Sequence, residues 1–379
     1  MTRLLPIVDL APSLPWPELA SELQALGMRW VDPSGPGLSR HGGAGPSDHK
    51  AVTLGAETVM VPIFTQTARE SPYSAEVRGA GDTALLFRSG VRVAEIAFPR
   101  TPKFYGLFTA EGTPYWKIAT LHARDVLATT VLQTCTRYGN RETSCQFCAI
   151  GQSLARRATL AEKTPAELAE VAKAARDLDD VGHVVLTTGT PATPDRGARV
   201  LADCASAIRD AAGLPVQAQC EPPDDFGWFE RLADAGVGSL GMHLEAVTER
   251  VRREIMPGKA EVPIATYLEA FAAAVDVFGR GQVSTYILAG LGDTEEEILE
   301  FCGKLVGLGV YPFVVPFVPI AGTPLERHPA PRPEFMQSLL ATLALLLAQA
   351  NMSSSDIKAG CGRCGACSTL RAREARARA

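Results

Sequence analysis

Six of the nine cysteines in this chain lie in two tight groups, and their spacing could support metal chemistry. The first group contains Cys135, Cys145 and Cys148, and the second contains Cys361, Cys364 and Cys367. No export signal is visible, so the thiols should stay reduced, and groups of three do not divide into disulfides. The clustering therefore predicts two metal sites rather than disulfide bonds.

The first group has the spacing C-x9-C-x2-C and directly follows an apolar run. Three thiolates from one loop can hold three irons of a [4Fe-4S] cluster and leave the fourth iron open to another molecule. The alternative is a structural zinc site, which needs a fourth ligand close by. The nearby histidine, His122, precedes the apolar run and would lie at its other end. The spacing favours a cluster and leaves zinc open.

The second group has the spacing C-x2-C-x2-C, which looks like a ferredoxin run without its fourth cysteine. We predict a second [4Fe-4S] cluster here; a zinc site that borrows a distant ligand and free thiols are the alternatives. Cys220 ends a predicted strand, so it could complete this site or act on a substrate. Cys204 and Cys302 fall on apolar helix faces and are predicted to be core residues.

An α/β scaffold is expected to position the first group. From about residue 121, short apolar runs alternate with amphipathic helices, and the runs are typical of strands buried on both faces. The predicted strands are residues 128–133, 183–188, 216–219, 239–244, 282–288 and 311–316. Capping boxes at Thr164 and Thr294 mark the starts of two helices. Six such units predict a partial (β/α)6 TIM-type barrel, with functional residues at the carboxyl ends of its strands.

The remaining segments should flank this barrel, which we assign to residues 116–350. Residues 1–115 are predicted to form an α+β module that could cap the barrel mouth. Its expected elements are a helix at 16–26, an irregular loop at 32–47, and strands at 51–63, 83–87, 91–98 and 104–108. Residues 351–379 carry the second cysteine group and a short basic tail that we expect to be solvated and disordered.

Cys145-Gln146-Phe147-Cys148 resembles the Cys-x-aromatic-Cys signature of the radical S-adenosylmethionine (SAM) superfamily. In that superfamily the cysteine loop follows the first barrel strand, and the resemblance implies that Phe147 packs beside the SAM adenine. Most members have three residues in the first gap, whereas this chain has nine.

Further segments at the predicted strand ends are similar to superfamily motifs. Residues Thr187, Thr188, Gly189 and Thr190 stand where the Gly-Gly-Glu motif holds the SAM amino group, without its glutamate. His243 and Glu245 are similar to the ribose-binding pair of biotin synthase, and Gly290 and Gly292 to a glycine turn of the biotin-synthase-like branch. Stretches at 133–141, 148–152, 219–225 and 358–362 look like a radical SAM family encoded beside bacterial nitrilase genes.

This resemblance implies an enzyme that cleaves SAM reductively at the first cluster and makes a 5′-deoxyadenosyl radical. The expected partners are a small, nitrogen-containing substrate and an electron donor such as flavodoxin or ferredoxin. Cys220 and Tyr286 are the candidate catalytic residues, and Glu221, Asp224 and His243 are further candidates for substrate contact. The alternative function is a non-catalytic, zinc-stabilised protein that binds a ligand or a partner.

Composition narrows the possible partners. The formal net charge is −5 and no basic stripe is present, so nucleic acid is not expected as a partner. The longest apolar run, residues 339–350, is too short to cross a bilayer. With no export signal, these features predict a cytoplasmic protein without a membrane partner.

Overall fold

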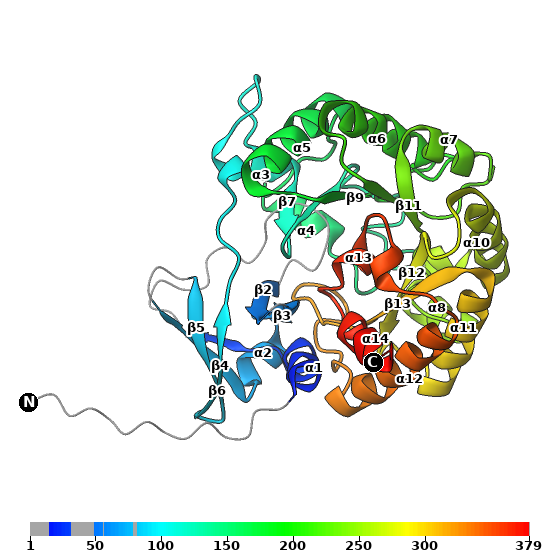
Figure 1. Ribbon diagram of the computed structural model, residues 1–379. Coiled ribbons are helices and arrows are strands. Elements are labelled where there is room, and N and C mark those ends of the chain that lie inside the picture. The colour runs from blue at the N-terminus through cyan, green and yellow to red at the C-terminus, as the bar shows by residue number, and fades with distance from the viewer. Residues whose placement is uncertain (1–14, 32–48, 56, 79–81, 379) are drawn as a thin grey trace, which may run out of the picture.

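The computed structural model describes residues 15–31, 49–55, 57–78 and 82–378. The loop predicted at 32–47 lies outside these residues. The described chain contains two sheets, one of six strands and one of seven. In Figure 1 the seven-stranded sheet curls inside a ring of helices, and the six-stranded sheet lies beside it.

The seven-stranded sheet forms the predicted partial barrel. Six strands pair in parallel in the order in which they occur along the chain: β8 (Val126–Thr130), β9 (His183–Thr187), β10 (Val216–Gln219), β11 (Val237–Gly241), β12 (Val283–Ala289) and β13 (Val310–Pro316). A short strand, β7 (Thr120–His122), adds to β8 antiparallel at the edge. Every residue of β8, β10 and β13 is buried, as expected for strands covered on both faces.

Helices connect these strands and cover the outside of the sheet (Figure 1). The longer ones are α5 (Pro165–Asp179), α6 (Ala198–Ala212), α10 (Ile264–Phe278), α11 (Glu295–Leu308) and α12 (Pro333–Gln349). Shorter ones are α3 (Tyr115–Ile118), α4 (Ile150–Ala155), α7 (Trp228–Asp234), α8 (Glu249–Ile255) and α9 (Pro257–Ala260). The capping boxes predicted at Thr164 and Thr294 are both present, at the starts of α5 and α11.

The N-terminal region has a sheet and a core of its own. The sheet order is β1 (Arg29–Val31), β4 (Tyr73–Arg78), β5 (Thr83–Arg88), β6 (Val91–Ala97), β2 (His49–Leu54) and β3 (Glu57–Pro62). Helix α1 (Trp16–Leu26) has the predicted bounds, and α2 (Gln66–Glu70) is short. The strand predicted at 104–108 is wrong. There a 3-10 helix, Lys103–Gly106, begins after Pro102, and the Asp179 carboxylate accepts hydrogen bonds from the first two backbone N–H groups of that helix.

The prediction of a solvated basic tail is also wrong. After η2 (Ser354–Asp356) and α13 (Cys361–Cys364), the chain ends in helix α14 (Leu370–Arg378), which packs on α12. Glu374 is buried in this helix and accepts hydrogen bonds from the backbone and hydroxyl of Ser354 at 2.9 Å. Arg376 pairs with Glu18 of α1 at 3.0 Å. Specific acceptors therefore order a segment whose composition alone suggested disorder.

Candidate active site

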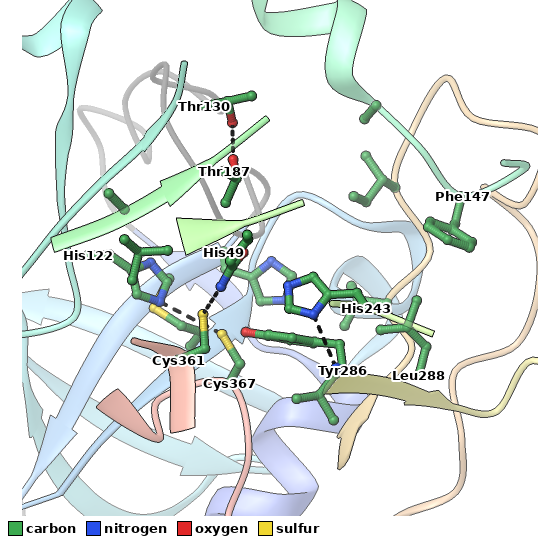
Figure 2. Close-up of a pocket in the computed structure, with 18 of the residues that line it drawn as sticks. His49, His122, Thr130, Phe147, Thr187, His243, Tyr286, Leu288, Cys361 and Cys367 are labelled. Carbon is green, nitrogen blue, oxygen red and sulfur yellow. Dashed lines mark hydrogen bonds between the residues drawn. The ribbon is translucent and has the colours of Figure 1, made fainter. Parts of the chain in front are cut away.

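A cavity of about 390 Å³ extends from the barrel to the N-terminal sheet, where His49 lines it, and Figure 2 shows Phe147 on one side of it and Cys361 and Cys367 on the other. Phe147 and Cys148 line it from the loop that follows the carboxyl end of β8. Cys361, Cys364 and Cys367 also line it. This second group lies at the amino ends of the strands, because the Gly360 N–H donates to His183, the first residue of β9. Cys148 of the first group and all three cysteines of the second therefore face one chamber.

The first cysteine loop brings its three thiols together. Cys148 interacts electrostatically with both Cys135 and Cys145, and none of the three is in a disulfide. The Cys148 N–H donates to the Cys145 carbonyl at 3.1 Å, and the Ile150 N–H donates to the Cys148 sulfur. Burial raises the pKa of the Cys148 thiol to about 11, so iron would have to displace its proton.

The nine-residue gap in this loop is itself folded. The hydroxyls of Thr143 and Ser144 each donate to the Arg137 carbonyl at 2.9 Å, which closes the extra residues into a compact turn. Gln146 anchors the loop to α8 by donating its N–H to the Ile255 carbonyl at 2.8 Å. Three adjacent, reduced thiols on an anchored loop fit the ligand set of a [4Fe-4S] cluster with one open iron.

Two buried ion pairs lie beside this loop, and neither was predicted from the sequence. Lys259 of α9 pairs with Glu245 at 2.7 Å, and Arg137 pairs with Glu221. Burial alone would raise the pKa of Glu221, but Lys259 and Arg137 hold it below its usual value. Lys259 also acts on Cys145, where it opposes the effect of burial on the thiol pKa. Because Lys259 belongs to no motif, only the fold could reveal its place.

The residues predicted to contact SAM divide into two sets. Phe147, Thr187, His243 and Glu245 line the cavity, whereas Thr188, Gly189, Thr190, Gly290 and Gly292 do not. Gly189 packs instead against the cysteine loop, where an added Cβ would lie 2.1 Å from the Thr134 carbonyl oxygen. The Thr190 hydroxyl donates to Glu221 at 2.8 Å. Gly290 and Gly292 have φ values of 108° and 124°, which favour glycine.

Hydrogen-bond donors surround the second cysteine group. The Gln219 amide donates to the Cys361 sulfur at 3.2 Å, and His122 Nε2 lies 3.7 Å from the Cys367 sulfur. The Tyr286 hydroxyl makes hydrogen bonds with both sulfurs. Figure 2 shows His122 and Tyr286 directed at these cysteines. Tyr286 was a candidate catalytic residue, and its hydroxyl is directed at the second group rather than at the first.

Three histidines line the cavity, and of these only His243 was predicted as a site residue. Burial lowers the pKa of His49 to about 3, of His122 to about 4 and of His243 to about 3, so these rings are neutral near pH 7. His49, His122 and His243 all line the cavity. His122 does lie at the opposite end of the barrel from the first group, as expected from its place before β8, but that end holds the second group.

Two candidate residues lie away from the cavity. Cys220 is buried in the main core and does not line the chamber; burial raises the pKa of its thiol to about 12. Asp224 is exposed and pairs with Arg196 at 3.2 Å. Cys204 and Cys302 are buried core residues, as predicted.

In the described part of the chain, no group of three or more His, Cys, Asp or Glu side chains is arranged to hold one metal ion. A [4Fe-4S] cluster instead takes its thiolates on separate irons. The same described residues include no helix that is long and apolar enough to cross a membrane.

Residues 133–305 match the family model of the Radical SAM superfamily, which covers the cysteine loop and the strands up to α11. This part of the chain is a Radical SAM domain, and the chain is an enzyme. This result favours the enzyme over the zinc-stabilised binding protein that the sequence left open.

Two relatives show what the sequence is similar to. The bacteriochlorophyllide c C-7(1)-hydroxylase of Chlorobaculum limnaeum is 28% identical over 289 residues, which is 71% of this chain and 71% of the hydroxylase. The "Probable dual-specificity RNA methyltransferase RlmN" of Symbiobacterium thermophilum is 29% identical over 138 residues, 36% of this chain and 37% of the methyltransferase.

Solved structures were also matched. The alignment with the structure of methylornithine synthase (PylB) covers 68% of this chain and 69% of the synthase, with 16% sequence identity and a TM-score of 0.47. The alignment with the FeFe-hydrogenase maturase HydG from Carboxydothermus hydrogenoformans covers 63% of this chain and 54% of HydG, with 17% sequence identity and a TM-score of 0.44.

Proposed function

We propose that this enzyme cleaves SAM at a [4Fe-4S] cluster held by Cys135, Cys145 and Cys148, and directs the radical into the barrel cavity. The observation that carries the proposal is the placement of the loop. Its three reduced thiols lie together after the carboxyl end of β8, and Phe147 and Cys148 line the barrel cavity. When bound, the cluster and SAM supply a 5′-deoxyadenosyl radical, which removes hydrogen from an unactivated carbon.

The residues of the chain position the cofactor and exclude water. Phe147 is proposed to pack against the adenine, and the carboxylate of Glu245, fixed by Lys259 at 2.7 Å, faces the same chamber. His243 is a further polar contact. Its Nδ1 accepts from the Tyr286 N–H at 3.2 Å, and its Nε2 is buried without a partner. A buried, unpartnered nitrogen is ready to bind a polar group of the cofactor or the substrate.

The substrate is proposed to be a small, nitrogen-containing molecule. The cavity of about 390 Å³ has apolar walls, including Val126, Val185 and Leu288, with a few polar side chains such as Gln133 and His243. Such a lining suits a compact body with one or two hydrogen-bonding groups. The proposal that the substrate contains nitrogen rests on the resemblance to the family encoded beside nitrilase genes.

Among the reactions open to such an enzyme, we favour oxidation of a carbon–hydrogen bond, with lyase, rearrangement and sulfur-insertion chemistry as the alternatives. The support is the hydroxylase relative, which aligns over 71% of both chains. The RNA methyltransferase match bears against the expectation that no nucleic acid binds, but it spans 36% of this chain. We therefore propose a small-molecule substrate held inside the barrel.

A second [4Fe-4S] cluster is proposed at Cys361, Cys364 and Cys367, and a flavodoxin or ferredoxin is proposed to supply the electron for SAM cleavage. The support for the cluster is the C-x2-C-x2-C spacing together with the donors that reach two of its sulfurs.

The test is the release of 5′-deoxyadenosine from protein reconstituted anaerobically with iron and sulfide and then given dithionite and SAM. We expect product from the parent and none from Cys145→Ala. Cys204→Ala, which changes a buried core cysteine outside both groups, is the matched control and should retain product. Equal release of 5′-deoxyadenosine from the parent and from Cys145→Ala would contradict the proposal.

A further inference from the structure

The sulfurs of Cys361 and Cys367 receive polar side chains from three different elements of the barrel. His122 ends β7, Gln219 ends β10 and Tyr286 lies within β12. All three side chains line the cavity, as do the cysteines, and Figure 2 shows His122 and Tyr286 near Cys361 and Cys367. Because the three residues are at least 67 positions apart from one another in the chain, no local sequence pattern predicts that they meet.

The orientation of Gln219 shows that it acts as a donor. Its Nε2 lies 2.8 Å from the Gln217 Oε1 and 3.2 Å from the Cys361 sulfur. Gln217 is fixed in turn, because its Oε1 accepts from the Cys361 N–H at 3.1 Å and its Nε2 donates to the Ser284 hydroxyl at 3.2 Å. The amide of Gln219 therefore presents N–H to the sulfur.

Tyr286 and His122 complete the set. A phenol can donate to a thiolate, and Tyr286 is held in place by edge contacts with His243 and Phe313, at ring-centroid distances of 4.7 and 5.1 Å. His122 Nε2, at 3.7 Å from the Cys367 sulfur, is the ring nitrogen that would carry the proton toward it. A sulfur that carries negative charge would thus meet N–H or O–H groups on several sides.

Hydrogen bonds to cluster sulfurs stabilise the more negative, reduced state, and this raises the reduction potential. We propose that His122, Gln219 and Tyr286 form a donor set that holds the thiolates of Cys361 and Cys367 and raises the reduction potential of the second cluster. They are positioning residues, because they act through the cysteines. This inference rests on the second cluster of the proposed function.

The arrangement also suggests a role for the second cluster in electron transfer. Its cysteines and its donors line the same chamber as Cys148 and Phe147, so a molecule in the chamber lies between the two groups. A cluster with a raised potential at that position is suited to accept an electron from the substrate.

The experiment uses the full chain with Cys135, Cys145 and Cys148 replaced by alanine, so that only the second cluster remains. Iron and sulfide are counted first, and the potential is then measured by redox titration followed by electron paramagnetic resonance (EPR). In this background, Tyr286→Phe, Gln219→Met and His122→Met each remove one donor. Thr130→Val is the matched control: Thr130 also lines the cavity, but its hydroxyl contacts Thr187 at 2.8 Å.

We expect each donor variant to keep its iron and to shift the reduction equilibrium about tenfold toward the oxidised state, which is about 59 mV for a one-electron couple. Thr130→Val should keep the parent potential, and His122→Gln, which retains an N–H, should recover part of the shift. Unchanged potentials in the three donor variants, with iron retained, would overturn the inference. Loss of iron in His122→Met alone would overturn it for His122 and make that residue a ligand. If the chain that lacks the first three cysteines binds no iron, both the second cluster and its donor set are overturned. The first cluster is tested separately by the release of 5′-deoxyadenosine.

Discussion

The two cysteine groups face one cavity but are built in different ways. The first depends on a single loop of 14 residues, and the charged pairs Lys259–Glu245 and Arg137–Glu221 lie beside it. The second lies on a short C-terminal segment, and neutral donors from distant strands surround it. Fixed charge is suited to hold a charged cofactor, whereas neutral donors are suited to adjust the potential of a cluster. The difference indicates that the two groups have different tasks.

The largest expected effect comes from breaking the charged surroundings of the first group. Lys259→Met leaves the Glu245 carboxylate, whose side chain is only 15% exposed, without its partner, which should lower the free energy of unfolding by about 3 to 5 kcal/mol. Urea unfolding of the metal-free protein measures this. The control is Lys304→Met, which removes an exposed pair with Glu300 and should leave the unfolding midpoint unchanged. Equal midpoints for Lys259→Met and the parent would show that the pair does not hold this end of the barrel.

A glycine next to the second group offers a way to disturb that group alone. Gly360 has a φ of 109°, and an added Cβ would lie 2.1 Å from the Gln217 amide carbon. Gly360→Ala should cost about 3 kcal/mol through backbone strain and the displaced amide. Iron analysis should show loss of the second cluster, while 5′-deoxyadenosine release at the first group persists. Loss of both clusters would mean that the two groups are not independent.

The matching change at the first group is Gly189→Ala. Its Cβ would lie 2.1 Å from the Thr134 carbonyl oxygen, so the cysteine loop must shift, at a cost of about 2 kcal/mol. We expect lower iron occupancy at the first group and an unchanged second cluster, as measured by EPR. Gly303→Ala is the control, because its Cβ would meet only Leu346, at 3.9 Å. A Gly189→Ala protein with normal iron at the first group would refute this role.

The smallest effect is a pH dependence at the second group. His183 is buried and accepts from the Gly360 N–H at 3.1 Å; burial lowers its pKa to about 4. The unfolded ring has a pKa near 6.5, so the unfolded state takes up the proton first as the pH falls. Stability from this residue is therefore present above pH 6.5 and falls by about 1.3 kcal/mol between pH 7.5 and 5.5. Urea unfolding at both pH values should show a smaller loss in His183→Asn than in the parent. Equal losses of stability in the two proteins would contradict the lowered pKa of His183.

The sequence alone predicted the features that depend on residues close together in the chain. The six parallel strands, the two capping boxes and the first cysteine loop all follow from short patterns, because each depends on neighbours along the chain. The donors of the second group could not be found in this way. Gln219 and His122 meet the cysteines only after the C-terminal segment folds back against the barrel.

The same limit explains the errors. The basic tail was expected to be solvated because its composition is charged, yet Glu374 finds buried partners in Ser354 and Tyr311. The predicted strand at 104–108 has an apolar composition, but Asp179 from α5 caps a 3-10 helix there. In both places a side chain from elsewhere in the fold decided the local structure, and no local pattern reports such a contact.

The central claim is that SAM binds at the first cysteine group and not at the second. The most direct measurement is EPR of the reduced protein before and after addition of SAM, in two variants that each lack one group. The variant with Cys361, Cys364 and Cys367 replaced by alanine should show a spectrum that SAM changes. The variant with Cys135, Cys145 and Cys148 replaced by alanine should show a spectrum that SAM leaves unchanged. A SAM-dependent change in the second variant and none in the first would contradict the account.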